Sequence, residues 1–390
     1  MAPGVAIALG RVAVPPFVGM AVFGLAIWCA ATLLGWAAEA AEVDITGALA
    51  IALLAIVAIL PEYAVDVFLA FTAGSDPAYE SLASANMNGA TRLLIGLALP
   101  LVVLVGITAR RRKARRDSAP LPPALLDTLP IPKEHYSTMF FLMIGAALAT
   151  AAPLAAQVHA GLGAVLLVVF AVFLWHAARG DVHEPDLVGV AAYLGSLAQR
   201  PRRCAVIALF LLAAGTIAVG AEPFVHALVA SGQALHVNEA LLIQWLAPLA
   251  SEAPEFIIAL TLAYRHKAWA AVGMLLTSMV NQWTALVGSL PFAYKLGGGT
   301  WSLPLDSRQV EEFWLTASVT AVAITLLLRL RIPAWGAWFM LVVFAAEFAL
   351  PDQHARLVLA AVNAVAALAL LAWGARRVPA FLAQAFKREA

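Results

Sequence analysis

The sequence predicts an all-α polytopic membrane protein with about 11 transmembrane helices, two inverted five-helix repeats and an extra C-terminal helix. Of its 390 residues, 63% are hydrophobic and only 12% are charged, whereas soluble domains are close to half apolar and a quarter charged. The hydrophobic residues collect in long runs, and most Lys and Arg residues lie in the short connections between them. A chain of this composition has too little polar surface for water, so we expect it to lie in a lipid bilayer.

The apolar runs set the number and place of the helices. A bilayer core about 30 Å thick needs about 20 apolar residues per helix. Runs of this kind lie near residues 13–37, 47–72, 82–108, 137–155, 160–178, 204–230, 238–264, 268–294, 312–330, 334–350 and 355–375.

The basic residues set the orientation of these helices. With the N-terminus outside, nineteen Lys and Arg residues fall on the inner side and four, namely Arg11, Lys295, Arg308 and Arg356, on the outer side. Positive charge collects on the cytoplasmic side of membrane proteins. The expected topology is therefore an outside N-terminus and a cytoplasmic C-terminus, in the plasma or inner membrane.

The chain divides into two halves and a tail. Residues 1–178 form the first predicted transmembrane repeat, 179–203 a cytoplasmic loop, 204–350 the second repeat, and 351–390 an extra C-terminal helix and tail. Residues 117–132 contain five prolines, which predicts an irregular linker on the inner side.

Two Pro-Glu pairs mark equivalent places in the halves. Pro61-Glu62 lies in motif helices spanning 47–108, and Pro254-Glu255 in motif helices spanning 238–294. From each Glu to the Pro that closes the next helix is 38 residues in the first half and 36 in the second. The second copy lies five spans after the first, so the two cross the membrane in opposite directions, as in the inverted repeats of secondary transporters.

Polar residues around these pairs are candidate cation ligands. A proline inside a helix removes a backbone hydrogen bond, so Pro61 and Pro254 are expected to kink or break their helices and expose carbonyl groups beside the following Glu. Carboxylate, amide and hydroxyl oxygens suit Ca²⁺, Na⁺ or H⁺ rather than a transition metal. The candidate ligands are Glu62, Glu255, Asp66, Glu252, Ser251, Asn86, Asn88, Thr91, Ser278, Asn281 and Gln282.

The motif at Ser251–Glu255, with a polar small-residue helix after it, resembles the second α-repeat of the sodium/calcium exchangers in the cation/calcium antiporter superfamily. That family carries Gly-Thr-Ser-x-Pro-Glu followed by Gly-Ser-Asn-x-x-Asn/Asp. The resemblance covers both repeats. It implies a five-plus-five inverted architecture with an additional C-terminal helix.

The resemblance also implies roles for individual residues. Glu62 and Glu255 would be the central cation ligands. Thr91 and Gln282 would lie at, or within a turn of, the second pair of ligand positions. Ser251 falls on the family's Thr, and Glu252 on its Ser.

Two features depart from the family pattern. The first repeat has Ala58 and Ile59 where the family places hydroxyl groups. Arg92 follows Thr91 inside the site-forming helix, where a guanidinium would neutralise Asp66 or Glu62 or stand in for a bound cation.

These observations leave three related functions open. The first is an antiporter that moves Ca²⁺ or a similar cation in exchange for Na⁺ or H⁺ by alternating access. The second is a proton/cation exchanger that uses the same carboxylates. The third is a transporter-like fold whose site is blocked by Arg92.

An enzyme is not expected, because the chain has no Gly-x-Gly-Asp, Gly-x-Ser-x-Gly or His-Glu-x-x-His motif. The expected partners are small inorganic cations and the bilayer, with no cofactor and no nucleic acid. Glu222 and Glu347 are expected to be peripheral.

Overall fold

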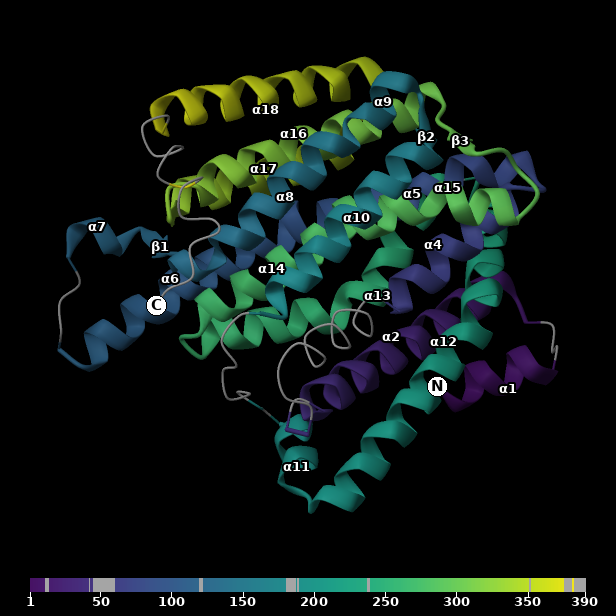
Figure 1. Ribbon diagram of the computed structural model, residues 1–390, viewed down its shortest axis with the longest axis horizontal. Coiled ribbons are helices and arrows are strands. Elements are labelled where there is room, and N and C mark those ends of the chain that lie inside the picture. Colours follow the sequence, from purple (N-terminus) through teal and green to yellow (C-terminus); the bar gives the residue numbers. More distant parts are fainter. Residues whose placement is uncertain are drawn as a thin grey trace. The chain divides into compact units, whose positions relative to one another are not determined.

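The computed structural model describes residues 1–10, 14–41, 43–44, 60–118, 122–179, 187, 189–236, 239–350, 352–374 and 381. Almost all of this part of the chain is helical (Figure 1). The helices are α1 (Ala2–Gly10), α2 (Pro16–Ala41), α4 (Leu60–Ala73), α5 (Glu80–Arg92), α6 (Leu99–Arg116), α7 (Pro123–Leu126), α8 (Tyr136–Ala149), α9 (Ala151–Ala155), α10 (Ala160–Ala177), α11 (Val190–Ser196), α12 (Gln199–Leu235), α13 (Glu239–Tyr264), α14 (Ala268–Asn281), α15 (Val287–Leu296), α16 (Ser307–Leu327), α17 (Ala334–Ala349) and α18 (Gln353–Gly374).

Short elements connect or interrupt these helices. Two are 3₁₀ helices, η1 (Pro77–Tyr79) and η3 (Lys133–His135), and two are π-helical segments, η2 (Leu93–Ala98) and η4 (Gln282–Leu286). Four strands complete the set: β1 (Thr128–Pro130), β2 (Gln157–His159), β3 (Ser302–Pro304) and β4 (Arg331–Pro333).

The predicted fold class is confirmed. Within the described residues, 9 helical stretches are long and apolar enough to cross a bilayer, and α17 is a shorter apolar helix. Each of these lies on one of the predicted runs. Of the predicted run 47–72, residues 47–59 lie outside the described part of the chain and the remainder forms most of α4.

Two strand pairs agree with the predicted alternation of connections across the membrane. β1 pairs with β4 in antiparallel register, Leu129 opposite Ile332, and both strands lie in connections predicted to be inside. β2 pairs with β3, Val158 opposite Leu303, and both lie in connections predicted to be outside. A miscounted span between the paired strands would have put their connections on opposite sides of the membrane.

Two connections are more ordered than the sequence predicts. The segment 117–132, expected to be irregular, contains α7 and β1, because β1 finds a partner strand 200 residues later that local proline content does not reveal. The predicted loop 179–203 contains α11 and the first residues of α12.

The chain forms two compact units. Unit 1 comprises residues 1–89, 168–255 and 289–301, and unit 2 comprises 90–167, 256–288 and 302–390. Each unit therefore takes segments from both predicted repeats.

In unit 1, α2 lies along α12 (Figure 1). Lipid tails are as apolar as Leu, so helices in a membrane associate through close packing of small side chains rather than through the hydrophobic effect. The contact follows that rule, since its buried residues are Ala30, Leu34, Ala38, Ala213 and Ile217.

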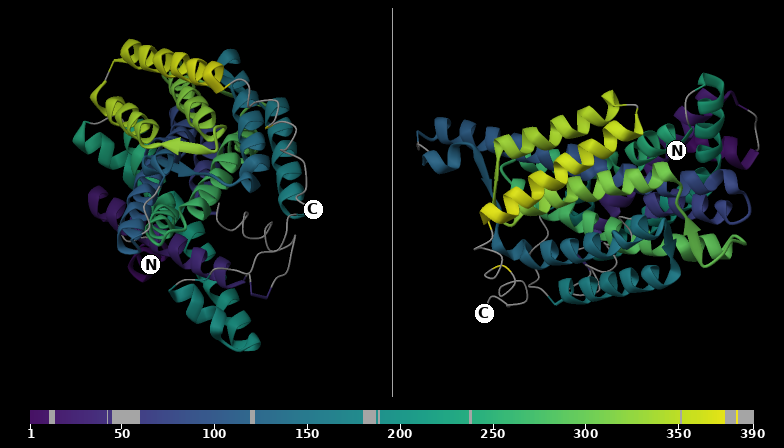
Figure 2. Two further views of the ribbon diagram at one scale, coloured as in Figure 1. Left: turned by 90° about the vertical axis from the view of Figure 1, so that its left-hand side faces the viewer. Right: turned by 90° about the horizontal axis from the view of Figure 1, so that it is seen from above.

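In unit 2, α16 packs against α18, α17 packs against α6, and α8 packs against α14. The two views of Figure 2 show α16 and α18 side by side. Only 17% of the apolar 18-residue stretch of α18 is buried inside the protein, whereas 78% of the corresponding stretch of α16 is buried. α16 is therefore a core helix of this unit, and α18 covers one side of it and otherwise faces outward.

The two π-helical segments occupy matching places in the repeats. Each begins where the polar stretch of its helix ends, and each is followed by an α-helix that carries the closing proline, Pro100 or Pro291. In other proteins, π-helical segments frequently occur at functional sites.

One glycine allows two motif helices to meet in unit 1. A Cβ atom added at Gly89 of α5 would lie 1.6 Å from the backbone oxygen of Gln244 in α13. That carbonyl lies four residues before Pro248, which has no N–H to donate to it. The absence of a side chain at Gly89 therefore lets α5 approach this carbonyl closely.

Candidate functional site

Helix α4 carries a polar stripe on its buried side. Glu62 and Asp66 are one turn apart, and their exposed fractions are 4% and 0%. On the same helix Val67 and Phe71 are 38% and 49% exposed. The polar side of the helix thus faces protein and part of its apolar surface is exposed, the reverse of a helix in a soluble protein.

Helix α13 carries the second acidic pair. Glu252 is buried and Glu255, three residues on, is partly buried, while Leu249 and Ile257 are more than half exposed. The helix is continuous from Glu239 to Tyr264. Of the expected kink or break at Pro254, the break does not occur, because the proline is accommodated within an unbroken helix, as it is at Pro248.

The acidic side chains of the two helices meet. The Glu252 carboxyl is in hydrogen-bonding contact with the carboxyls of both Glu62 and Glu255. Glu252 therefore lies between the two residues that the sequence nominates as central ligands. A hydrogen bond between two carboxyl groups requires a proton on at least one of them.

Asp66 extends this acidic cluster toward α5. Its neighbour there is the Asn86 amide, and neither Asp66 oxygen has a hydrogen-bond partner among the described residues. A fully buried carboxylate in that state is costly unless it binds a cation or a proton.

Two predicted ligands direct their side chains along their own helices. The Ser251 hydroxyl donates to the carbonyls of Ala247 at 3.3 Å and Pro248 at 3.2 Å. The Asn88 amide donates to the Ser84 carbonyl at 3.1 Å. These bonds satisfy backbone oxygens one turn away.

The remaining predicted ligands belong to unit 2. Thr91, Asn281 and Gln282 are almost completely buried, and Ser278 is partly buried. Asn281 ends α14 and Gln282 begins the π segment η4, while Thr91 lies two residues before η2. Their role as ligands stays a prediction.

Arg92 is paired with two glutamates that are not among the predicted cation ligands. Its guanidinium forms ion pairs with Glu312 of α16 and, at 3.1 Å, with Glu347 of α17. The expectation that Glu347 is peripheral is wrong: it is 7% exposed. Hydropathy placed Glu347 in the tenth span, but did not reveal that this face of α17 packs against the helix of Arg92.

The pair belongs to a larger buried charge network that sequence reasoning missed. Arg356, at the start of α18, binds Glu311 at 2.7 Å and Glu312 at 2.9 Å. Arg308 lies 4.0 Å from Glu312. Two adjacent acidic residues at the start of a predicted span were the available signal, because such residues need partners inside the protein.

No group of three or more His, Cys, Asp or Glu side chains in the described residues converges as a ready-made metal site. The carboxyls of Glu62, Glu252 and Glu255 bond to one another rather than surrounding one point. A cation would have to replace the proton-mediated contacts between them.

Comparison with known proteins agrees with this arrangement. The family model for the sodium/calcium exchanger protein matches residues 15–179 and 205–350. A crystal structure of the H⁺/Ca²⁺ exchanger CAX shares 31% sequence identity, with 98% of this chain and 94% of that chain covered and a TM-score of 0.90. No curated protein matches the chain significantly.

More distant structures show the same fold. The sodium-calcium exchanger NCX_Mj soaked with 10 mM Na⁺ and zero Ca²⁺ is 15% identical, with 89% of this chain and 100% of that chain covered and a TM-score of 0.55. The same exchanger soaked with 2.5 mM Na⁺ and 0.1 mM Ca²⁺ is 16% identical, with coverages of 86% and 98% and a TM-score of 0.55.

Proposed function

The chain belongs to the sodium/calcium exchanger protein family, and from that premise we propose that it is a cation antiporter that moves Ca²⁺ across the membrane in exchange for H⁺. The observation that carries the proposal is the contact of the Glu252 carboxyl with those of Glu62 and Glu255. The 31% identical CAX structure is that of an H⁺/Ca²⁺ exchanger, which supports the choice of ion.

The acidic cluster favours protons as the counter-ion. Helices α4 and α13 contain no Lys or Arg, so their buried carboxyls have no basic neighbour on either helix. Carboxyls in mutual contact share protons, because like charges this close cannot all be ionised. The protonated cluster is close to neutral and suits a buried site.

Calcium binding and proton binding use the same atoms. Ca²⁺ prefers six to eight oxygen ligands, including carboxylates. A carboxyl must lose its proton before it can bind the ion. Protons and Ca²⁺ therefore compete for Glu62, Glu252 and Glu255, and this competition is the chemical basis of exchange.

Alternating access supplies the second requirement. Glu62 and Glu255 come from repeats predicted to run in opposite directions, and transporters of that design bind their substrate where the repeats meet. Opening first to one side and then to the other would deliver Ca²⁺ in one direction and protons in the other. We assign the protein to the plasma or inner membrane, with the N-terminus outside and the C-terminus in the cytoplasm.

The ion pairs of Arg92 disfavour the blocked-site alternative. Its guanidinium already binds Glu312 and Glu347 in unit 2. An arginine held by two carboxylates is a poor substitute for a cation at a third acidic site.

The test is ⁴⁵Ca²⁺ uptake into proteoliposomes that contain the purified protein. An acid interior should drive uptake, because outward proton flow supplies the energy, and an outward Na⁺ gradient at equal pH should not. Uptake driven by Na⁺ alone would reject proton coupling, and no uptake under either gradient would favour the blocked-site alternative.

Competition also predicts a pH dependence. If one proton must leave for each Ca²⁺ bound, the apparent Ca²⁺ affinity should fall about tenfold for each unit of decreasing pH below the titration of the cluster. Glu252→Gln should weaken this dependence. Glu222→Gln, at a 65% exposed side chain on α12, should leave it unchanged.

A further inference from the structure

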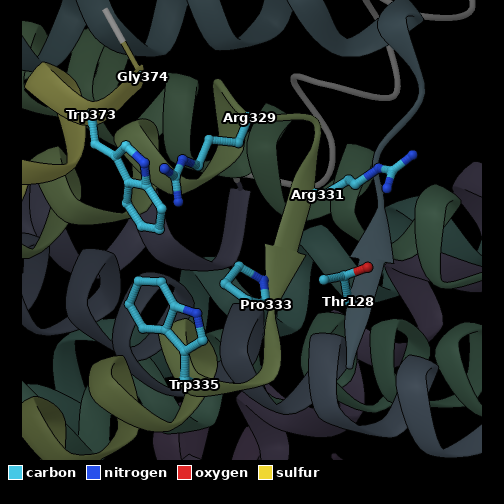
Figure 3. A pocket seen from close by; sticks show the side chains of 7 residues that line it. All are labelled: Thr128, Arg329, Arg331, Pro333, Trp335, Trp373 and Gly374. Carbon is cyan, nitrogen blue, oxygen red and sulfur yellow. The ribbon is translucent and has the colours of Figure 1, made fainter. Parts of the chain in front are cut away.

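A pocket of about 410 Å³ lies at one end of unit 2, and none of the predicted cation ligands is among its lining residues. It is lined by Thr128, Arg329, Arg331, Pro333, Trp335, Trp373 and Gly374. Figure 3 shows the indoles of Trp335 and Trp373 on one side of Pro333, with Arg331 and Thr128 on the other.

The lining is basic and aromatic. It holds two arginines, and no acidic residue is among its described members. Asp127, next to Thr128 in the chain, forms an ion pair with Arg111. An anion is therefore the kind of ligand that complements the pocket.

The tryptophans indicate that the anion comes from the bilayer. Trp335 and Trp373 are 51% and 73% exposed, and exposed indoles at the ends of membrane helices are typical of the lipid headgroup region. The guanidinium of Arg329 lies 3.8 Å from the centre of the Trp373 ring. That contact holds the arginine beside the indole at headgroup depth.

The surrounding structure keeps the pocket in place. Thr128 and Pro333 are paired across the β1–β4 ladder, and Trp335 is the second residue of α17, which begins immediately after β4. Trp373 lies at the end of α18, a helix that is mostly exposed and so is flanked by lipid. All these segments meet at the predicted cytoplasmic side.

We propose that this pocket binds the phosphate headgroup of an anionic phospholipid from the cytoplasmic leaflet. The arginines neutralise the phosphate, and the indoles pack against the glycerol and upper acyl region. Basic pockets between membrane helices on the cytoplasmic side recognise such headgroups. The lipid joins the end of α18 to the β1–β4 ladder.

Native mass spectrometry of the full-length protein in detergent tests the proposal. Titration with phosphatidylglycerol should give one saturable lipid adduct that phosphatidylcholine does not give. Arg329→Gln together with Arg331→Gln should weaken binding about 10- to 30-fold, since each arginine near an anionic headgroup contributes to the attraction. Arg331→Gln alone, at an exposed side chain, should give a smaller loss.

A matched control removes the same charge elsewhere. Arg200→Gln together with Arg265→Gln changes two exposed arginines on the same predicted side, outside the pocket, and should leave the adduct intact. Equal losses in the two double variants would overturn the proposal, because the attraction would then be a general property of the basic surface.

A further experiment distinguishes a lipid headgroup from a soluble phosphate as the ligand of the pocket. Inorganic phosphate and glycerol phosphate should not displace the lipid at millimolar concentration, and Trp373→Leu should weaken lipid binding about threefold by removing an interfacial contact. Displacement by inorganic phosphate, or no effect of Trp373→Leu, would identify a soluble anion as the ligand and reject the lipid assignment.

Discussion

Units 1 and 2 both bury carboxyl groups, but the partners of these carboxyl groups differ between the two units. In unit 2, three glutamates meet three arginines in one network: Glu311, Glu312 and Glu347 with Arg92, Arg308 and Arg356. In unit 1, Glu252 meets two other carboxyls, and the helices that carry them contain no Lys or Arg.

This difference separates a structural role from the exchange role that we propose. Fixed guanidinium groups neutralise the unit 2 glutamates permanently, so that network holds α16, α17 and α18 to the helix of Arg92. The unit 1 carboxyls depend on protons or a cation, both of which can leave. Buried acidic residues alone therefore do not identify the site; the partners of those residues do.

The repeats show the same contrast at one position. Arg92 and Trp283 each lie eight residues before the closing proline of their motif helix, Pro100 or Pro291, and both are fully buried. Arg92 binds two glutamates, whereas the Trp283 indole donates a hydrogen bond to the Thr320 hydroxyl at 3.1 Å. Each residue ties its helix to α16, one through charge and the other through a neutral hydrogen bond.

The largest expected effect comes from removing an arginine from the buried network of glutamates and arginines in unit 2. Arg92→Met leaves the buried Glu347 without its guanidinium partner and removes one of the arginines that bind Glu312, which should lower the free energy of unfolding by about 3–5 kcal/mol. Chemical unfolding in detergent micelles measures this change. Adding Glu347→Gln should recover part of the loss, and Arg265→Met, at an exposed residue, should cost little. Unchanged stability in Arg92→Met would contradict a structural role.

A substitution in the acidic cluster of unit 1 should instead lower transport and leave stability intact. Glu62→Gln keeps the hydrogen-bonding shape but removes an ionisable group, so Ca²⁺ transport should fall at least about 100-fold, or about 2.7 kcal/mol. Stability should be unchanged or higher, because Gln keeps a polar side chain that cannot become a costly buried charge. Uptake assays with Glu222→Gln as the control decide the point. Normal transport in Glu62→Gln would remove this residue from the site.

The next largest effect is expected on stability, at the contact between α5 and α13. Gly89→Ala places a methyl group against the Gln244 carbonyl, and the forced separation should cost about 1–3 kcal/mol. Gly215→Ala is the matched control, since no atom lies within 4 Å of a Cβ there. Thermal unfolding that ranks the two variants equally would show that α5 and α13 can move apart without penalty.

The smallest effect is expected at a pair outside the membrane spans. Hydrogen bonds from the Arg202 guanidinium, at 2.8 Å, lower the pKa of Asp44 to about 2. Because the folded-state pKa is below the unfolded value of 3.8, the stabilisation is full above about pH 4 and is lost as pH falls toward 2.

Asp44→Asn should therefore lower stability by about 0.5–1 kcal/mol at pH 7 and by less at pH 3. Asp117→Asn, at an exposed residue, serves as the control for unfolding at the two pH values. A loss at pH 3 as large as that at pH 7 would contradict the ion pair as the cause.

Much of the fold was predictable because its causes are local. Bilayer thickness and the need to satisfy backbone hydrogen bonds within each helix fix the length of every span, and basic residues fix the alternation of connections. Hence the sequence alone predicted an all-α membrane protein, the span positions, and the acidic residues of α4 and α13. It also placed the closing prolines, although not the π-helical segments that precede them.

Contacts between distant helices were decided only by tertiary structure. The rotation and register of two packed helices depend on side chains from both, so Glu252 meeting Glu62 and Arg92 meeting Glu347 could not be read from either segment alone. The same reason explains why Glu347 looked peripheral in its own span. The sequence determined which charged residues enter the membrane, and the packing determined which of them meet an arginine and which meet other carboxyl groups.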